Sequence, residues 1–394
     1  MKYTGKIKCS ACGTSDVSHR LLLTTGILEE TIGRLGRYSL KVFAVNESHP
    51  LFKYSERIIS SLARILKIIS YSSDKEKAIT GRSRLIWDEA EERGIKMEQV
   101  LVFGKPIESY RALIDGKYFN FESLPVPLHL PRSGYLWVDN KFILSEKLIA
   151  EGIPAPKTKE AMTYGSALRA FNSLSKPVII KPRSGSRGRH TTTNINTEKE
   201  LRDALSLAHV IAPVVVVEEH LFGSVYRATV VDGKLVGFFR ADPPSVTGDG
   251  THTVQELIDI KNKSRHELLS DIKVNDDVLA FLERQNLNLD SVIEKDRVVN
   301  LSAKTGRFYG GYTREMLPEV HPKMHSYFER AGKLVDIPVA GFDLIIDDPT
   351  KDPDEQRWGI IECNSMPFID LHYFSLEGEH INIAKNVWDL WRKK

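Results

Sequence analysis

Three oxygen-bearing side chains near the end of the sequence have the pattern of a cation site. Asp343 lies in the apolar run 341–346 and Glu362 in the run 360–363, with Asn364 two residues further on. Such runs predict paired, buried strands, in which residues two apart point to the same face. Because a buried carboxylate needs a counter-charge, and magnesium prefers oxygen ligands, the pattern predicts a magnesium site. In the alternative interpretation, Asp343 and Glu362 pair with Arg or Lys and only stabilise the sheet.

Basic residues further upstream form a pattern that suits phosphate. Residues 176–183 predict a buried strand that carries Lys181 near its end, and the loop 184–190 (Ser-Gly-Ser-Arg-Gly-Arg-His) follows directly. Backbone N–H groups of such a loop wrap around phosphate oxygens, while Lys181, Arg187 and Arg189 supply positive charge. The loop has neither the Gly-Lys-Ser/Thr of a Walker A motif nor G-x-G-x-x-G. Taken alone, it is explained equally well by a plain flexible loop.

The elements that must position these side chains follow from periodicity and turn residues. The valines of 214–217 predict a strand that ends in Glu218 and Glu219. Asp115-Gly116 and Asp232-Gly233 predict type I′ hairpins over 109–121 and 226–240. Further strands are predicted at 39–45, 100–103 and 297–300, and helices at 57–70, 88–93, 140–151, 194–208, 253–260, 262–296 and 327–335.

Composition excludes several classes of protein. A chain of 394 residues is expected to hold two or three packed units, and 41% hydrophobic with 27% charged residues is ordinary for a soluble enzyme. The net charge of +3 is too balanced to indicate a nucleic-acid partner. Three cysteines argue against a disulfide scaffold. We find no apolar run near the ~20 residues of a membrane span and no signal peptide, so we expect a cytoplasmic protein.

The N-terminal third offers weaker signals. Cys9 and Cys12 form half of a zinc motif, but a solvent-facing turn explains them better, and whether they bind metal stays open. The predicted helix 57–70 is basic and amphipathic, which suits packing on its own domain more often than a membrane surface. The proline-rich segment 125–131 marks a boundary near residue 134.

The order of these parts resembles the ATP-grasp superfamily of carboxylate–amine ligases. The likeness is nearest to the ATP-grasp portion of cyanophycin synthetases and bifunctional glutathione synthetases. It is carried by 226–237 (Tyr-Arg-Ala-Thr-Val-Val-Asp-Gly-Lys-Leu-Val-Gly), by Arg240, by 248–258 and by 361–367, and it covers about residues 136–394.

This resemblance implies an α/β (α+β) ATP-grasp fold, in which two α+β subdomains grip ATP between antiparallel sheets. The ATP-grasp domain would span 135–394, with a lid at about 176–222 and a catalytic subdomain at about 223–394. Residues 1–134 would form an N-terminal α/β domain, of unknown role and without a family likeness of its own.

Residue roles also follow from the resemblance, position by position. Lys181 would hold the α- and β-phosphates, Glu218 would accept from the adenine amino group, and Arg240 would neutralise the transferring phosphate. Where relatives place an acidic residue that contacts the ribose, this chain has Val225, which puts that contact in doubt. Two magnesium or manganese ions would be held by Asp343, Glu362 and Asn364. The triphosphate loop and the adenine-reading backbone would comprise Ser184, Gly185, Ser186, Arg187, Gly188, Glu219 and Leu221.

The implied reaction joins a carboxylate to an amine through an acylphosphate, with release of ADP and phosphate. Amino acids or short peptides are the expected substrates, and a homo-oligomer is plausible for this family. His372 is a candidate for substrate contact, with a packing role as the alternative. An ATP-grasp kinase and a non-catalytic ATP sensor are the alternative functions. The oxyanion of the second step has four candidate partners, among which the sequence does not choose: Arg297, Lys304, Arg307 and Arg314.

Overall fold

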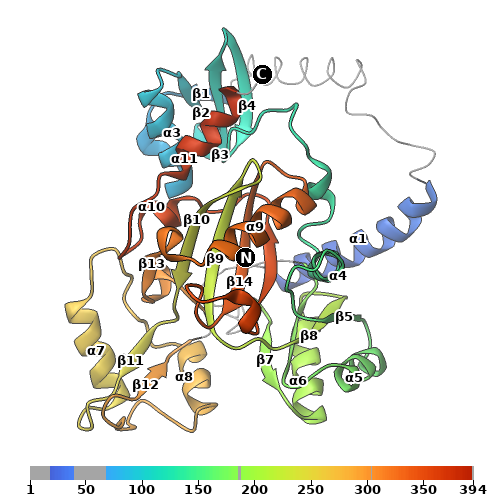
Figure 1. The fold of residues 1–394 in the computed structure, drawn as a ribbon, viewed down its shortest axis with the longest axis vertical. Coiled ribbons are helices and arrows are strands. Elements are labelled where there is room, and N and C mark those ends of the chain that lie inside the picture. Colours follow the sequence, from blue (N-terminus) through green and yellow to red (C-terminus); the bar gives the residue numbers. More distant parts are fainter. Residues whose placement is uncertain (1–17, 40–67, 185–187, 303, 393–394) are drawn as a thin grey trace, which may run out of the picture.

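The computed structural model describes residues 18–39, 68–184, 188–302 and 304–392 (Figure 1). Cys9, Cys12, the predicted strand 39–45 beyond its first residue and most of the predicted helix 57–70 lie outside these residues. The end of that predicted helix is wrong, because Ile69 and Ser70 belong to strand β1 (Ile69–Ser72).

A four-stranded antiparallel sheet forms the N-terminal unit, residues 68–130. Its order is β1-β2-β3-β4, with β2 at Met97–Val102, β3 at Lys105–Ile114 and β4 at Lys117–Glu122, and helix α3 (Gly81–Glu92) lies beside it. Asp115 and Gly116 connect β3 to β4 with φ values of 48° and 74°, as a type I′ turn requires. The predicted hairpin is therefore confirmed.

A five-stranded antiparallel sheet, here called the central sheet, occupies the middle of the molecule (Figure 1). Its order is β13-β10-β9-β14-β15, and helix α9 (Pro322–Val335) packs against β9 and β10. Apolar side chains of these strands and of α9 build its core, with Phe238, Phe328 and Phe342 fully buried. The strands are β9 (Ser224–Val231), β10 (Lys234–Ala241), β13 (Thr313–Glu315), β14 (Val339–Ile346) and β15 (Gly359–Asn364).

A second four-stranded antiparallel sheet, the lid sheet, has the order β5-β8-β6-β7. Its central strand β8 (Val215–Glu219) is buried throughout, as expected for a run of β-branched valines. Helix α6 (Glu198–His209) begins with the capping box Thr197–Glu200 and packs on this sheet with α5 (Tyr164–Ser173). Helix α4 (Lys141–Ala150) leads into β5 (Thr158–Ala161), and β6 (Val178–Pro182) and β7 (Thr192–Ile195) complete the sheet.

A small satellite unit has its own core. It pairs β11 (Ser245–Thr247) with β12 (Val298–Asn300) and adds α7 (Val254–Ser264), which begins at the predicted capping box Thr253–Glu256. The prediction of helix over 262–296 is wrong, because only α8 (Asp276–Glu283) is helical beyond the end of α7. Loops follow α8, and Asn286 and Asp296 there adopt positive φ, which ends regular helix.

Segments from both ends of the described chain pack against distant elements. Helix α11 (Ile383–Asp389) follows α10 (Asp370–Tyr373) and shares a hydrophobic core with α3 and β2–β4 (Figure 1). Helix α1 (His19–Ser39) lies near the lid sheet.

No helix among the described residues is both long and apolar enough to cross a bilayer. Short 3₁₀ turns are η2 (Lys75–Lys77), η3 (Ser133–Leu136), η4 (Arg307–Tyr309), η5 (Leu317–Glu319), η6 (Pro353–Glu355) and η7 (Leu390–Arg392).

Candidate active site

A cavity of about 420 Å³ separates the lid sheet from the edge of the central sheet. Ile179 on β6, Leu221 after β8, and Ile345 and Ile361 on β14 and β15 give it apolar walls. Cavities of this size, mostly apolar with a few charged groups, are typical of small-molecule sites. Ser184, Gly188 and Arg189 of the predicted phosphate loop also line it, whereas Gly185, Ser186 and Arg187 lie outside the described residues.

Lys181 and Glu218 meet inside this cavity. Lys181 Nζ donates to Glu218 Oε1 at 2.7 Å, and both side chains are buried. Strand alternation explains why Glu218 faces the cavity while the neighbouring Glu219 turns away, where its carboxylate accepts from the backbone N–H of Ser175. The structure thus brings together two residues that the sequence predicted for nucleotide binding.

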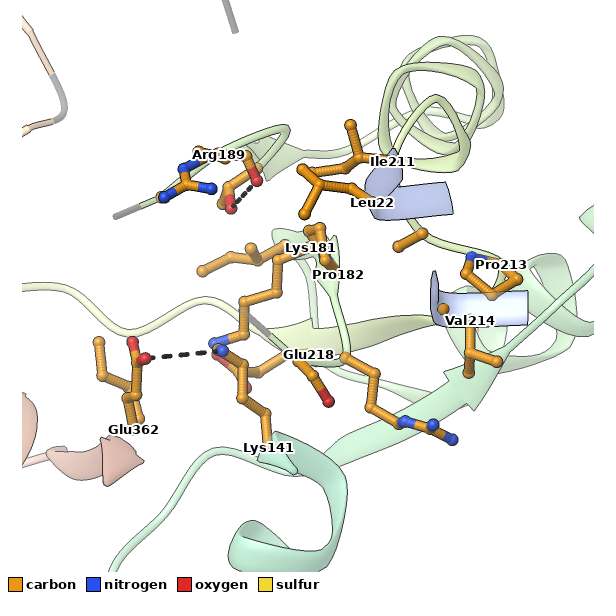
Figure 2. A pocket seen from close by; sticks show the side chains of 18 of the residues that line it. Leu22, Lys141, Lys181, Pro182, Arg189, Ile211, Pro213, Val214, Glu218 and Glu362 are labelled. Atoms are coloured by element: carbon orange, nitrogen blue, oxygen red, sulfur yellow. Dashed lines mark hydrogen bonds and ion pairs between the residues drawn. The ribbon is translucent and has the colours of Figure 1, made fainter. Parts of the chain in front are cut away.

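A second lysine, which the sequence analysis missed, enters from the other side. Lys141 is the first residue of α4, directly after the N-cap Asn140, and its Nζ lies 3.7 Å from Glu362 Oε1. Figure 2 shows the Lys141 and Lys181 side chains converging toward Glu362. Burial lowers the pKa of Lys141, and burial raises the pKa of Glu362 against the opposing effect of Lys141. A lysine at the start of an amphipathic helix gives no sequence signal of such a role.

Asp343 and Glu362 lie directly opposite each other on β14 and β15, and Asn364 pairs with Gly341 two residues along. The predicted pairing of the two strands is confirmed. Asp343 has another partner across the sheet, since Arg227 on β9 donates to its Oδ1 from Nε at 2.6 Å and to its Oδ2 from Nη2 at 2.9 Å. In the sequence Arg227 is a single charge within an apolar run, and it was not predicted as a site residue.

The same set of oxygens is compatible with a bound magnesium ion. Asp343, Glu362 and Asn364 supply the hard oxygen ligands that magnesium prefers. Part of the rise in the pKa of Glu362, after the larger contribution of burial, comes from the neighbouring Asp343 carboxylate, a repulsion that a cation would relieve. No group of three or more His, Cys, Asp or Glu side chains with metal-site geometry occurs within the described parts of the chain. Metal binding by the two carboxylates and the amide therefore stays a prediction.

The five cationic candidates for catalysis do not gather at the cavity. None of them is among the described residues that line it. Arg297 is exposed, and Arg240 pairs with Asp242 on its own strand end. Arg314 pairs with Glu319, Lys304 with Asp277, and Arg307 lies near Asp370.

His372 is fully buried behind the central sheet. Its Nδ1 lies 2.5 Å from Glu315 Oε2, and its Nε2 lies 2.8 Å from Thr229 Oγ1. Glu315 Oε1 in turn accepts from the backbone N–H of Phe238, Met316 and Leu317. These surroundings fit the packing alternative, and they leave substrate contact by His372 a prediction without geometric support.

Helix α1 closes one side of the cavity, which nothing in the sequence indicated. Leu22, Thr25, Gly26 and Glu30 of α1 line the same space as Lys181 and Glu218. Glu30 forms an ion pair with Arg183, directly after β6. Gly26 lies so close to Pro213 that a Cβ there would come within 2.9 Å of the proline ring. A segment from the start of the chain is therefore part of the cavity wall.

The fold has a counterpart among solved structures. The chain superimposes on the bifunctional glutathione synthetase of Pasteurella multocida with a TM-score of 0.56 at 24% identity, covering 79% of this chain and 43% of that one. Two antiparallel sheets facing each other across a cavity constitute the ATP-grasp fold that the sequence predicted, and the predicted fold is confirmed.

Sequence relatives confirm the predicted resemblance. Over 248 residues the chain is 34% identical to the cyanophycin synthetase of Synechocystis sp., covering 61% of this chain and 28% of that protein. Over 266 residues it is 30% identical to the glutathione biosynthesis bifunctional protein GshAB of Mannheimia succiniciproducens, covering 64% of this chain and 35% of that protein. The chain thus spans only about a third of the length of these relatives. No family model matches it.

The likeness extends further upstream than the motifs suggested. The cyanophycin synthetase of Nostoc sp. matches 80% of this chain at 27% identity. Residues 136–394 are 259 of the 394, or 66%, so this match must include part of the N-terminal third. The expectation that residues 1–134 lack any family likeness is therefore wrong.

Proposed function

We propose that this protein is an ATP-dependent carboxylate–amine ligase that forms an amide or peptide bond on amino acids or short peptides. One observation carries the proposal. Two buried lysines, Lys141 and Lys181, converge with Glu218 and Glu362 in the cavity between the two sheets. Lysines held this way suit the phosphates of ATP, since a compact ammonium neutralises phosphate charge without needing a fixed plane.

In the proposed reaction, a substrate carboxylate oxygen attacks the γ-phosphorus of ATP, and the bond from that phosphorus to ADP breaks. An amine nitrogen then attacks the acyl carbon of this acylphosphate and forms the C–N bond. The bond between the acyl carbon and the bridging oxygen breaks, phosphate leaves with that oxygen, and the amine proton passes to solvent. Phosphoryl transfer needs mainly alignment and charge neutralisation. Lys141 and Lys181 supply the charge, and apolar walls from Ile345 and Ile361 exclude water. Asp343, Glu362 and Asn364 would hold the magnesium that shields the phosphates.

The proposal is tested by phosphate release from ATP and magnesium, with pooled carboxylates supplied with and without pooled amines. A ligase releases ADP and phosphate only with both pools and yields a new amide, detected by mass spectrometry. ADP formation with a phosphorylated product and no need for an amine would assign a kinase instead. ATP binding without turnover from any pool would indicate a sensor.

The lysines can be tested separately. Lys141→Met and Lys181→Met each remove one charge next to the phosphates, and we expect ligase activity to fall by about 100-fold or more, as for loss of one preorganised electrostatic contact. Lys351→Met is the matched control, because Lys351 is exposed and its ion pair is with Asp348, far from the cavity lining. Full activity in both cavity variants would contradict the assignment of the cavity as the ATP site.

A further inference from the structure

Arg82 connects the N-terminal unit to the chain segment that follows the predicted metal ligands. It is the second residue of α3 and only 7% exposed, and its Nη1 donates to the carbonyl oxygens of Met366 at 2.6 Å and Pro367 at 3.3 Å. Both carbonyls belong to the irregular segment 365–369, directly after Asn364 at the end of β15. Backbone groups outside a sheet need other partners, and here an arginine from a different unit provides the donor.

Hydrogen bonds within the N-terminal unit hold the Arg82 guanidinium in place. Its Nη2 donates to Ser123 Oγ at 2.6 Å and lies 3.7 Å from Glu108 Oε1. The Glu108 carboxylate accepts from Ser83 Oγ at 2.5 Å and from Thr80 Oγ1 at 2.9 Å. Burial alone would raise the pKa of Glu108, and hydrogen bonds from these hydroxyls and from Ser123 outweigh it and lower that pKa. Glu108 therefore stays charged opposite Arg82, and the guanidinium is fixed from the side of the N-terminal unit.

The segment 365–369 is held on its other side by the central sheet. Gly341 on β14 pairs with Asn364 on β15, and a Cβ at Gly341 would come within 2.6 Å of the Pro367 Cβ. Real side chains essentially never approach so closely, so the glycine leaves the room that the proline ring fills. Pro367 thus contacts the sheet at the Gly341–Asn364 pair with its ring, while its carbonyl oxygen accepts from Arg82.

Asn364 depends on this segment for its position. It is the last residue of β15, and the ends of strands open most easily unless the chain beyond them is held. Asp343 and Glu362 lie inside the ladder, where paired neighbours on both sides fix the backbone. A metal site needs ligands within about 0.5 Å of their productive positions. The amide of Asn364 is therefore the predicted ligand that most needs support from outside the sheet.

We propose that Arg82 is a positioning residue for the metal site. By holding the two loop carbonyls, it fixes the backbone after Asn364 and so keeps this amide in place as a ligand beside Asp343 and Glu362. This role rests on the proposed function, since magnesium belongs to that reaction, but metal binding itself does not require turnover. The N-terminal unit thereby takes part in the site, although none of its described residues (68–130) lines the cavity.

Manganese binding to the full chain tests this role, because Mn²⁺ takes the same oxygen ligands as magnesium and is detected directly by electron paramagnetic resonance. We expect Arg82→Met to bind Mn²⁺ about tenfold more weakly, as when a contact that orients a metal ligand is lost. Charge alone predicts the opposite result, since removal of a nearby cation leaves Mn²⁺ binding unchanged or makes it tighter. The direction of the change therefore separates positioning from electrostatics.

A double-mutant cycle with Asn364→Ala identifies the route by which Arg82 acts. Asn364→Ala should itself weaken Mn²⁺ binding, because one ligand is missing. Arg82→Met should then cause no further loss in the Asn364→Ala background, since the side chain that it positions is gone. An equal tenfold loss in both backgrounds would mean that Arg82 acts elsewhere, and it would overturn the inference.

Arg93→Met is the matched control. Arg93 is the C-cap residue of the same helix, and its Nη2 also donates to a carbonyl oxygen of the C-terminal segment, that of Lys385 at 3.0 Å. Lys385 lies on α11, however, and not in the segment after Asn364. The Mn²⁺ affinity of Arg93→Met should therefore equal that of the unmodified protein.

Arg82→Lys takes the place of Arg82→Met if the latter does not give a native circular dichroism spectrum. Lysine keeps the charge, but its compact ammonium does not span Met366 and Ser123 as the planar guanidinium does. We expect a smaller loss of Mn²⁺ affinity in Arg82→Lys, and no loss in the Asn364→Ala background.

The outcomes separate this role from the ligase reaction. Native Arg82→Met protein with unchanged or tighter Mn²⁺ binding would overturn the role of Arg82, as would an unmodified protein whose Mn²⁺ binding is absent or insensitive to Asn364→Ala. Weaker binding that depends on Asn364, in a protein without ATP turnover, would support the role of Arg82 and reject the ligase. Amide formation by the unmodified protein, with full Mn²⁺ binding in Arg82→Met, would keep the ligase and reject this role.

Discussion

Each of the two paired carboxylates of the central sheet has a basic partner. Asp343 is held by two hydrogen bonds from Arg227, and Glu362 is held less closely by Lys141, 3.7 Å away. The ion-pair alternative considered from the sequence is thus realised for both carboxylates. It does not compete with a metal role, because magnesium shared with phosphates brings its own negative partners to the site.

Arg227→Met should reveal how much the Arg227–Asp343 ion pair contributes to stability. Loss of the guanidinium leaves Asp343 partly buried without a counter-charge, and we expect the free energy of unfolding to fall by about 3 kcal/mol. That value is at the low end for buried pairs, because a quarter of the Arg227 side chain is exposed. Urea unfolding measures the change. Magnesium should restore part of the loss, since the cation replaces the missing charge.

Arg265→Met is the matched control for this change. Arg265 pairs with Asp271, whose side chain is 52% exposed, so little stability should depend on that pair. A loss in Arg227→Met no larger than in the control would contradict the structural role of Arg227. A loss that magnesium does not reduce would count against metal binding at Asp343.

The sequence predicted the parts of the site that follow from strand periodicity. Asp343 and Glu362 were expected on paired strands, and Lys181 and Glu218 at the ends of buried strands, and each lies there. Lys141 and Arg227 were missed because their roles depend on which elements pack together. No local pattern in α4 indicates that Lys141 will face Glu362 on β15. Likewise, none in β9 indicates that Arg227 will face Asp343 on β14.

At the level of elements, α1 and the lid sheet meet at two histidines. The rings of His19 on α1 and of His190, the last residue of the predicted phosphate loop, contact edge to face at 5.0 Å. Burial lowers the pKa of His190, and the nearby His19 and Arg189 lower it further, although His190 Nδ1 lies 2.7 Å from the Leu207 carbonyl oxygen. The packed form of this contact therefore favours neutral His190.

Acid should consequently loosen α1. The pKa of His190 is lower in the folded state than the ~6.5 of an unfolded chain, so the less packed state binds more protons as pH falls below about 6.5. Stability of the contact is complete above that value and declines below it. Hydrogen exchange of the α1 amides, corrected for intrinsic rates, should rise between about pH 7.5 and about pH 5.5.

His190→Gln, which lacks a titrating ring, should make α1 exchange independent of pH in this range. Helix α9, packed on the central sheet away from His190, provides the internal reference. Equal pH dependence of α1 in both proteins would show that other groups control this helix.

Element prediction from the sequence succeeded where local rules act alone. The Asp-Gly hairpins, the valine strand and the capping box at Thr253 all formed as predicted. The stretch 262–296 did not, since its charged composition suits helix but its turns are fixed by contacts with the satellite core. Helices α1, α5, α10 and α11 were not predicted. Of these, α10 and α11 are short and depend on tertiary packing.

At the scale of the whole molecule, the N-terminal unit is completed by the C-terminal segment. Trp388 of α11 is fully buried among α3 and β2–β4, and its Nε1 donates to the Ile86 carbonyl oxygen at 2.9 Å. Trp391 donates to the Pro125 carbonyl oxygen at 2.7 Å. A boundary near residue 134, drawn from prolines, does not reveal that Trp388 and Trp391 belong to the same core.

Trp388→Ala should therefore destabilise the N-terminal sheet selectively. Removal of a buried tryptophan costs about 3–5 kcal/mol, and here the cavity opens between α3 and β4. Amides of β2–β4 should lose exchange protection before those of β9 and β14. Trp358→Ala is the matched control, because Trp358 is also buried, in the core under α9. Uniform loss of protection in both variants would mean that the two cores unfold together.

Because α11 is part of this core, the N-terminal sheet cannot be completed until α11 has been synthesised. Strand β4 ends at residue 122 and α11 begins at residue 383, so 260 residues are translated between them. At about 5–20 residues per second, the first sheet waits roughly 13 to 52 s with one apolar face uncovered. A nascent chain of this protein therefore exposes an apolar surface to chaperones for a long time, until α11 leaves the ribosome and covers it.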